Sequence, residues 1–240
     1  MSGEQQRNSG DGTQALYGSV LPQTRFEKDG YAIVPLRRGD IFDIKQWRND
    51  QIDILRQQAP LTDDDQRRYY DDVVAVDGRS DQPRQILFSF LEGRNRCIGY
   101  GGLTNIDWVA RRAELSFLLA GDRNAEIHQF KLDFRRFLDL LTSVCFDILG
   151  LNRLFAETFD IRPYVIEVLE EVGFTAEGRM REHVMIDGKP VDSQLHGLVS
   201  RDRPGRNRTT EGTDIPAAPG IPTAMNVLVT SIGAKVPMIR

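Results

Sequence analysis

The sequence predicts a mixed α/β fold, with a mostly antiparallel sheet of six to seven strands and helices on both faces. Short apolar or alternating runs typical of strands recur between residues 31 and 199. One long segment, 130–148, carries apolar residues three and four positions apart, which is typical of a helix that packs on a sheet. A helix of that length between strands indicates a crossover connection, so the sheet should be mixed.

The first third of the domain predicts one strand and two helices. Tyr31–Leu36 is a short apolar strand, and Asp40 can cap a helix that runs through Trp47. Thr62 begins a second helix, whose early carboxylates suit the positive end of the helix dipole.

The rest of the domain predicts six strands and two helices. Gly93 lies in the turn between the first two of these strands, Gly150 ends the long helix, and Pro163 opens a helix that stops at Gly173. Asp187-Gly188 is a strong two-residue hairpin signal between the final two strands. The predicted strands are Ile86–Glu92, Cys97–Ile106, Ala113–Ala120, Arg153–Phe159 and two after Phe174.

Composition excludes several classes of function. The 240 residues are 40% apolar and 28% charged, which is ordinary for one globular core. A net charge of −4 gives no basic footprint for nucleic acid, and no apolar run approaches the roughly 20 residues that span a membrane. Two cysteines and three histidines without metal-ligand spacing predict no metal and no disulfide, and we expect a cytoplasmic protein.

Changes in composition divide the chain into four parts. Residues 1–24 are rich in Gly, Ser, Gln and Asn and predict a flexible arm. Residues 25–200 form the domain, and 201–223, rich in Pro, Gly, Thr and Arg, predict a linker. Residues 224–240 resemble the opening strand and turn of an ATP-grasp domain, which implies a fused or downstream ATP-grasp ligase.

Residues 26–200 resemble the GNAT superfamily of N-acyltransferases. The resemblance is carried by AELSFLLA at 113–120, by VLEEVGF, and by EGRMREHVMIDGKPVDSQLHGL in the last two strands. It is greatest for the branch that contains ribosomal-protein N-terminal and amino-sugar acetyltransferases. It implies acetyl-CoA or another acyl-CoA as cosubstrate, no metal, and an acceptor that is a small polar amine, such as an amino sugar or amino acid derivative, or a protein N-terminus. A homodimer is compatible with it.

One loop departs from the family pattern. Relatives follow the fourth strand with a glycine-rich loop that holds the coenzyme A pyrophosphate, but this chain has AGDRNAEIHQFKLDF. In one interpretation, helix N-terminal amides near Phe130, helped by Arg123 or Lys131, still receive the pyrophosphate. In the other, the domain is a catalytically silent binding module attached to an ATP-grasp ligase.

The resemblance also implies roles for particular residues. Backbone groups of Leu118, Leu119 and Ala120 would pair with the pantetheine arm, although their side chains could equally be plain core. Glu157 would be the general base, with Glu114 as a second candidate, because a carboxylate among apolar residues suits proton abstraction. For both carboxylates a solvated strand face is the alternative.

The remaining candidates depend on residue type and place. Tyr164 is the only tyrosine in its helix and would reprotonate the thiolate, unless it only packs at the helix start. Arg48, Asn49 and His183 are candidates for binding the acceptor; the first two could be surface residues, and a strand histidine is often structural.

Overall fold

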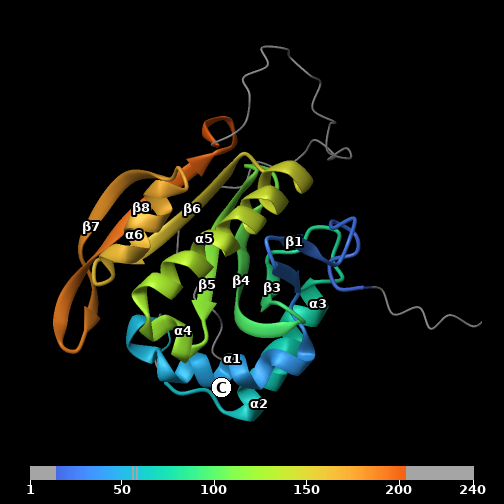
Figure 1. Cartoon of the computed structure of the whole chain (residues 1–240), viewed down its shortest axis with the longest axis horizontal. Coiled ribbons are helices and arrows are strands. Elements are labelled where there is room, and N and C mark those ends of the chain that lie inside the picture. Colours follow the sequence, from blue (N-terminus) through green and yellow to red (C-terminus); the bar gives the residue numbers. More distant parts are fainter. Residues whose placement is uncertain (1–14, 56, 58, 204–240) are drawn as a thin grey trace, which may run out of the picture. The chain divides into compact units, whose positions relative to one another are not determined.

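An eight-stranded sheet organises the computed structural model, which describes residues 15–55, 57 and 59–203 (Figure 1). Neighbouring strands are antiparallel except for β5 and β6, and the spatial order is β1-β2-β3-β4-β5-β6-β8-β7. The mostly antiparallel mixed sheet is therefore confirmed, with one strand more than the sequence predicts. The strands are β1 (Phe26–Lys28), β2 (Tyr31–Pro35), β3 (Ile86–Glu92), β4 (Arg96–Asp107), β5 (Arg112–Leu119), β6 (Arg153–Phe159), β7 (Thr175–Ile186) and β8 (Lys189–Val199).

The additional strand is β1, which forms a hairpin with β2. Asp29 and Gly30 connect the two strands with φ values of 52° and 83°, as a two-residue turn of the primed type requires. Asp187 and Gly188 do the same between β7 and β8, with φ values of 50° and 71°. Both tight hairpins therefore use the Asp-Gly pair, and the second confirms its sequence signal.

Helices cover both faces of the sheet, as the sequence predicts. α5 and α6 lie together on one face (Figure 1), and on the other face α1 contacts α2 and packs on the sheet through a second apolar cluster. The α-helices are α1 (Ile41–Asp50), α2 (Asp63–Arg68), α3 (Ala75–Asp77), α4 (Gly121–Ala125), α5 (Ile127–Ser143) and α6 (Pro163–Glu171). The other helical segments are the 3-10 helices η1 (Arg38–Asp40), η2 (Ile52–Ile54) and η5 (Ser200–Asp202) and the π-helices η3 (Tyr69–Val74) and η4 (Val144–Ile148).

The two faces have different cores. On the α5 face, the ring of Phe117 from β5 lies 4.7 Å from that of Phe134 and 4.6 Å from that of Phe137. On the other face, Leu118 packs with Ile44 of α1 and with other apolar residues. Because adjacent β5 residues face opposite sides, this strand belongs to both cores and is held firmly in place.

Of the two predicted helix caps, the structure contains the one at Thr62 and not the one at Asp40. Thr62 accepts a hydrogen bond from the backbone of Asp65 at 3.1 Å and its own N–H donates to the Asp65 carboxylate, which completes a capping box. Asp40 makes no cap with its side chain; its carboxylate instead accepts from Arg37 and from Ser89 at 2.6 Å. A cationic and a hydroxyl donor outcompete the helix amides for that carboxylate.

Part of the segment predicted as an arm packs on the sheet. Tyr17 is fully buried, its N–H donates to the Gly78 carbonyl at 2.6 Å, and its hydroxyl accepts from the Leu87 N–H at 3.1 Å. Leu21 is also buried, so the folded unit begins before residue 25. The predicted linker from 204 onward and the stub at 224–240 lie outside the described residues.

Candidate active site

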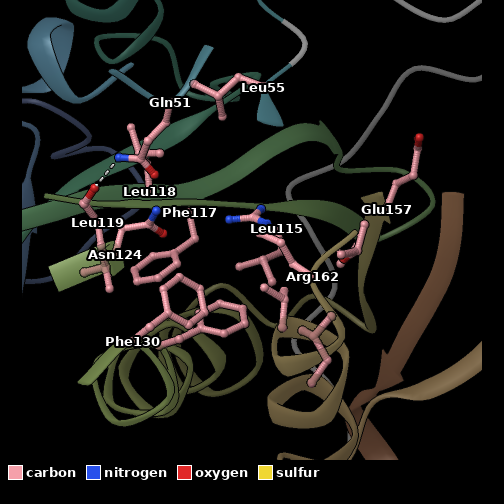
Figure 2. A pocket seen from close by; sticks show the side chains of 15 residues that line it. Gln51, Leu55, Leu115, Phe117, Leu118, Leu119, Asn124, Phe130, Glu157 and Arg162 are labelled. Carbon is pink, nitrogen blue, oxygen red and sulfur yellow. Dashed lines mark hydrogen bonds between the residues drawn. The ribbon is translucent and has the colours of Figure 1, made fainter. Parts of the chain in front are cut away.

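Strands β5 and β6 separate after a short parallel pairing. Their register joins Arg112–Glu114 to Arg153–Phe155, and within the described strands no pairing follows. A cavity of about 100 Å³ lies in the opening (Figure 2), lined by the second halves of both strands, by α6, and by residues near the start of α5. An opening between adjacent strands exposes backbone groups that a sheet would normally satisfy.

Alternate residues of β5 direct their backbone N–H and C=O groups toward this opening. The N–H of Ala120 donates to Ile98 in β4 at 2.9 Å, so by alternation Leu118 also turns its backbone groups toward β4. Leu115, Phe117 and Leu119 then face the opening. The carbonyl of Leu119 accepts a hydrogen bond from the Gln51 side-chain amide at 2.9 Å, which Figure 2 shows as a dashed line.

Three polar side chains, those of Gln51, Asn124 and Arg162, also line the cavity. The side-chain oxygens of Gln51 and Asn124 are buried and have no hydrogen-bond partner within the described residues. Arg162, just before α6, directs its guanidinium toward β5 (Figure 2). Burial lowers the pKa of Arg162, and the Tyr164 hydroxyl partly offsets this. In the sequence, Asn124 and Arg162 look like ordinary polar residues at helix ends, so no local pattern predicts that they line a cavity.

The two candidate bases lie on the face of the sheet opposite α5. Ala156 and Thr158 are buried toward α5, so Glu157 between them projects to the other side. Glu114 sits beside Phe155 in the parallel register and accepts a hydrogen bond from Asn105 at 2.6 Å. Glu157 therefore lines the cavity, whereas Glu114 lies at the last β5–β6 pair before the opening and outside the cavity lining.

His183 of β7 lies next to Glu157. Its Nε2 atom is 3.6 Å from Glu157 Oε1, and the two side chains are 44% and 15% exposed. The structure thus brings together a residue predicted to bind the acceptor and one predicted to act as base. Leu118, Leu119 and Phe130 line the cavity with Glu157.

The two cations predicted to meet the pyrophosphate are paired within the protein. Arg123 donates to Asp133 at 2.9 and 3.0 Å and also to Glu92. Burial opposes its charge, but these hydrogen bonds outweigh that effect and raise the pKa of Arg123. Lys131 pairs with Glu167. Neither lines the cavity, and α4 occupies the part of the chain where relatives carry the glycine-rich loop.

Three other candidates lie outside the cavity lining and make contacts within the protein. Arg48 donates to the Tyr100 hydroxyl at 2.6 Å. Asn49 exchanges hydrogen bonds with the backbone of Leu61 at 2.9 and 2.8 Å and so fixes the loop that follows η2. The ring of Tyr164 packs edge-on against Phe130, with 5.1 Å between centroids.

A comparison with known protein families identifies the domain that contains this opening. The model of an acetyltransferase (GNAT) domain matches residues 33–195. The chain belongs to this GNAT family. Within the described residues, no cluster of three or more His, Cys, Asp or Glu side chains could hold a metal ion, and no helix is long and apolar enough to cross a membrane.

Individual GNAT relatives share limited identity with the chain. A spermidine N(1)-acetyltransferase of Vibrio cholerae is 27% identical over 105 residues, which are 44% of this chain and 58% of that protein. The chain thus matches less than two thirds of that relative's length.

Solved structures support the same fold. A Vibrio cholerae spermidine N-acetyltransferase in complex with CoA and spermine has a TM-score of 0.63 at 20% identity, covering 73% of this chain and 98% of that one. A structure described as a dodecamer of spermidine N-acetyltransferase from the same organism has a TM-score of 0.60 at 21% identity, covering 72% and 95%. These relatives are named as spermidine acetyltransferases, a branch that differs from the one the sequence resembles.

Proposed function

We propose that this GNAT protein is an acyl-CoA-dependent N-acetyltransferase that transfers an acetyl group to a primary amine of a small polyamine-like metabolite. The observation that carries the proposal is the opening between β5 and β6. It offers β5 backbone that does not pair with β6, together with the carboxylate of Glu157, so a thioester and an amine can approach each other there. Proximity of this kind supplies much of the rate enhancement in a transfer between two substrates.

The cavity suits the pantetheine arm of the cosubstrate. That arm carries two amides, each with one donor and one acceptor. Backbone groups of Phe117 and Leu119 face the opening, and the buried oxygens of Gln51 and Asn124 can accept amide N–H groups. The guanidinium of Arg162 can donate to an amide carbonyl. The free N–H groups at the start of the 17-residue helix α5 are suited to the pyrophosphate.

The opposite side of the opening suits a cationic amine. Glu157 lines the cavity and Glu114 lies at the last β5–β6 pair before it, so negative charge there attracts an ammonium group. Glu157 then removes the proton that the nitrogen must lose before attack, and a backbone N–H of β5 polarises the thioester carbonyl. The names of the relatives, which act on spermidine, favour a polyamine over an amino sugar or amino acid derivative.

Two measurements test the proposal. Calorimetry should detect binding of acetyl-CoA, and turnover with spermidine should exceed turnover with glucosamine or a free amino acid. No binding at millimolar acetyl-CoA would overturn the enzyme assignment. Binding without transfer to any amine would instead indicate a silent binding module.

The role of Glu157 is tested by substitution. E157Q should lower kcat by about 10²–10⁴-fold, as expected for loss of a general base, and should leave the affinity for CoA unchanged. The matched control is E171Q, because Glu171 is a half-exposed carboxylate paired with Arg135 on the surface of α6. Equal turnover in E157Q and E171Q would remove Glu157 from the mechanism.

A further inference from the structure

We propose that a bulge in β7 holds His183 against Glu157, so that His183 passes to solvent the proton that Glu157 takes from the amine. This proposal rests on the proposed function. His183 acts through Glu157 and is a relay residue, and Asp192 is the positioning residue that fixes the bulge. Three independent features of β7 and β8 lead to this inference.

The first feature is an irregular register. β7 pairs with β8 from Gly178 to Met180 and again from Val184, but the register shifts between Met180 and Val184. Glu182 lies within the shift with a φ of 51°, which is an uncommon backbone conformation for a residue other than glycine. Bulges beside active sites commonly redirect a side chain, and strained conformations persist only where the surroundings impose them.

The second feature is the group that imposes this conformation. Asp192 of β8 accepts a hydrogen bond from the backbone N–H of Glu182 at 2.7 Å, and Arg179 also donates to it. These two donors hold the pKa of Asp192 below its usual range. Asp192 therefore remains a carboxylate at neutral pH and keeps the bulge in this geometry.

The third feature is where the bulge directs His183. Its Nε2 atom comes within 3.6 Å of Glu157 Oε1 across β8, the strand that separates β7 from β6. This distance is slightly longer than a hydrogen bond, as is common for catalytic pairs without substrate. The Glu157 side chain is 15% exposed and that of His183 is 44% exposed, so the imidazole links a sheltered carboxylate to water.

The proton balance of the reaction requires Glu157 to release a proton in every turnover. An ammonium group loses two protons as the C–N bond forms and the thioester C–S bond breaks. One proton ends on the sulfur of coenzyme A, and the other is taken by Glu157. Glu157 must release that proton before the next turnover, and a neutral imidazole can accept it and deliver it to water.

The decisive experiment is chemical rescue in the full-length protein. H183A should lower kcat by about 10²-fold, the lower end of the range for proton-transfer groups, with unchanged KM for spermidine and unchanged CoA affinity. Added imidazole should restore a large part of kcat in H183A and should not change kcat of the wild type or of E157Q. A loss of kcat that imidazole does not restore would mean that His183 is only structural, and unchanged kcat would also overturn the relay.

Two further variants test the bulge itself. D192N removes the charge that binds the Glu182 N–H, so kcat should fall toward that of H183A. E182G keeps the bulge, because glycine adopts positive φ freely, and should retain wild-type kcat. If D192N is as active as E182G, Asp192 does not position the relay. If the wild type acetylates no amine, the proposed function itself fails. If the wild type acetylates amines and H183A and D192N keep its kcat, the relay alone fails.

Discussion

The buried ion pair between Arg123 and Asp133 allows a quantitative test of how the region around α4 is held. The Asp133 side chain is 0% exposed and that of Arg123 is 11% exposed. R123A would leave the buried Asp133 carboxylate without its cationic partner, with neutral donors such as the Gln129 amide, at 2.9 Å, in its place. Breaking a buried pair by removing one partner costs about 3–5 kcal/mol of unfolding free energy. For a domain of this size that corresponds to a fall in Tm of roughly 6–20 °C.

Urea denaturation followed by tryptophan fluorescence measures this loss. The control is R67A, because Arg67 pairs with Asp64 at the surface, where the side chains are 45% and 79% exposed. Such pairs contribute about 1 kcal/mol or less. The double variant R123M/D133L should recover most of the stability lost in R123A, since no unpaired charge stays buried. An R123A protein as stable as R67A would refute the reasoning.

Three further predictions concern stability. T62A should lower the unfolding free energy by about 1 kcal/mol through loss of the helix cap, and an unchanged urea midpoint would contradict the capping role. G101A should cost about 1–3 kcal/mol, because its Cβ would lie 2.2 Å from a β5 carbonyl oxygen, whereas G178A, where the nearest atom is 3.9 Å away, should cost less; equal urea midpoints would contradict this. Arg153 lowers the pKa of Glu177 in the folded protein. The contribution of this pair to the unfolding free energy is therefore present above about pH 4.3 and is lost as the pH falls through the pKa of Glu177 in the folded protein. Urea midpoints should therefore fall more for wild type than for E177Q between pH 6 and 3, and parallel curves would exclude this contribution.

Local chemistry made most of the fold predictable. Seven strands and the main helices follow from apolar spacing and from turn residues such as Asp187-Gly188, whose conformation depends on the residues themselves. β1 has three residues, too few to show a period of two, although Asp29-Gly30 carries the same turn signal. The burial of Tyr17 depends on residues some 60 to 70 positions away, so its local sequence did not reveal it.

Long-range pairing limited the prediction of the site. Arg123 and Lys131 look available in the sequence, but their partners Glu92 and Glu167 lie 31 and 36 residues away. The contact between His183 and Glu157 depends on a bulge that periodicity cannot show. Charged residues are thus easily named as candidates from sequence, whereas their availability to a ligand is decided by the fold.

Strand β7 forms one outer edge of the sheet, where exposed backbone groups could template aggregation. Its charged residues Glu177, Arg179, Arg181 and Glu182 are exposed, and its pairing is irregular at two places. A strand from another molecule that paired with this edge would lose hydrogen bonds at the irregular positions and would lie against the charged side chains of β7. The charge and the irregular backbone of β7 therefore protect this edge of the sheet against strand pairing between copies of the chain.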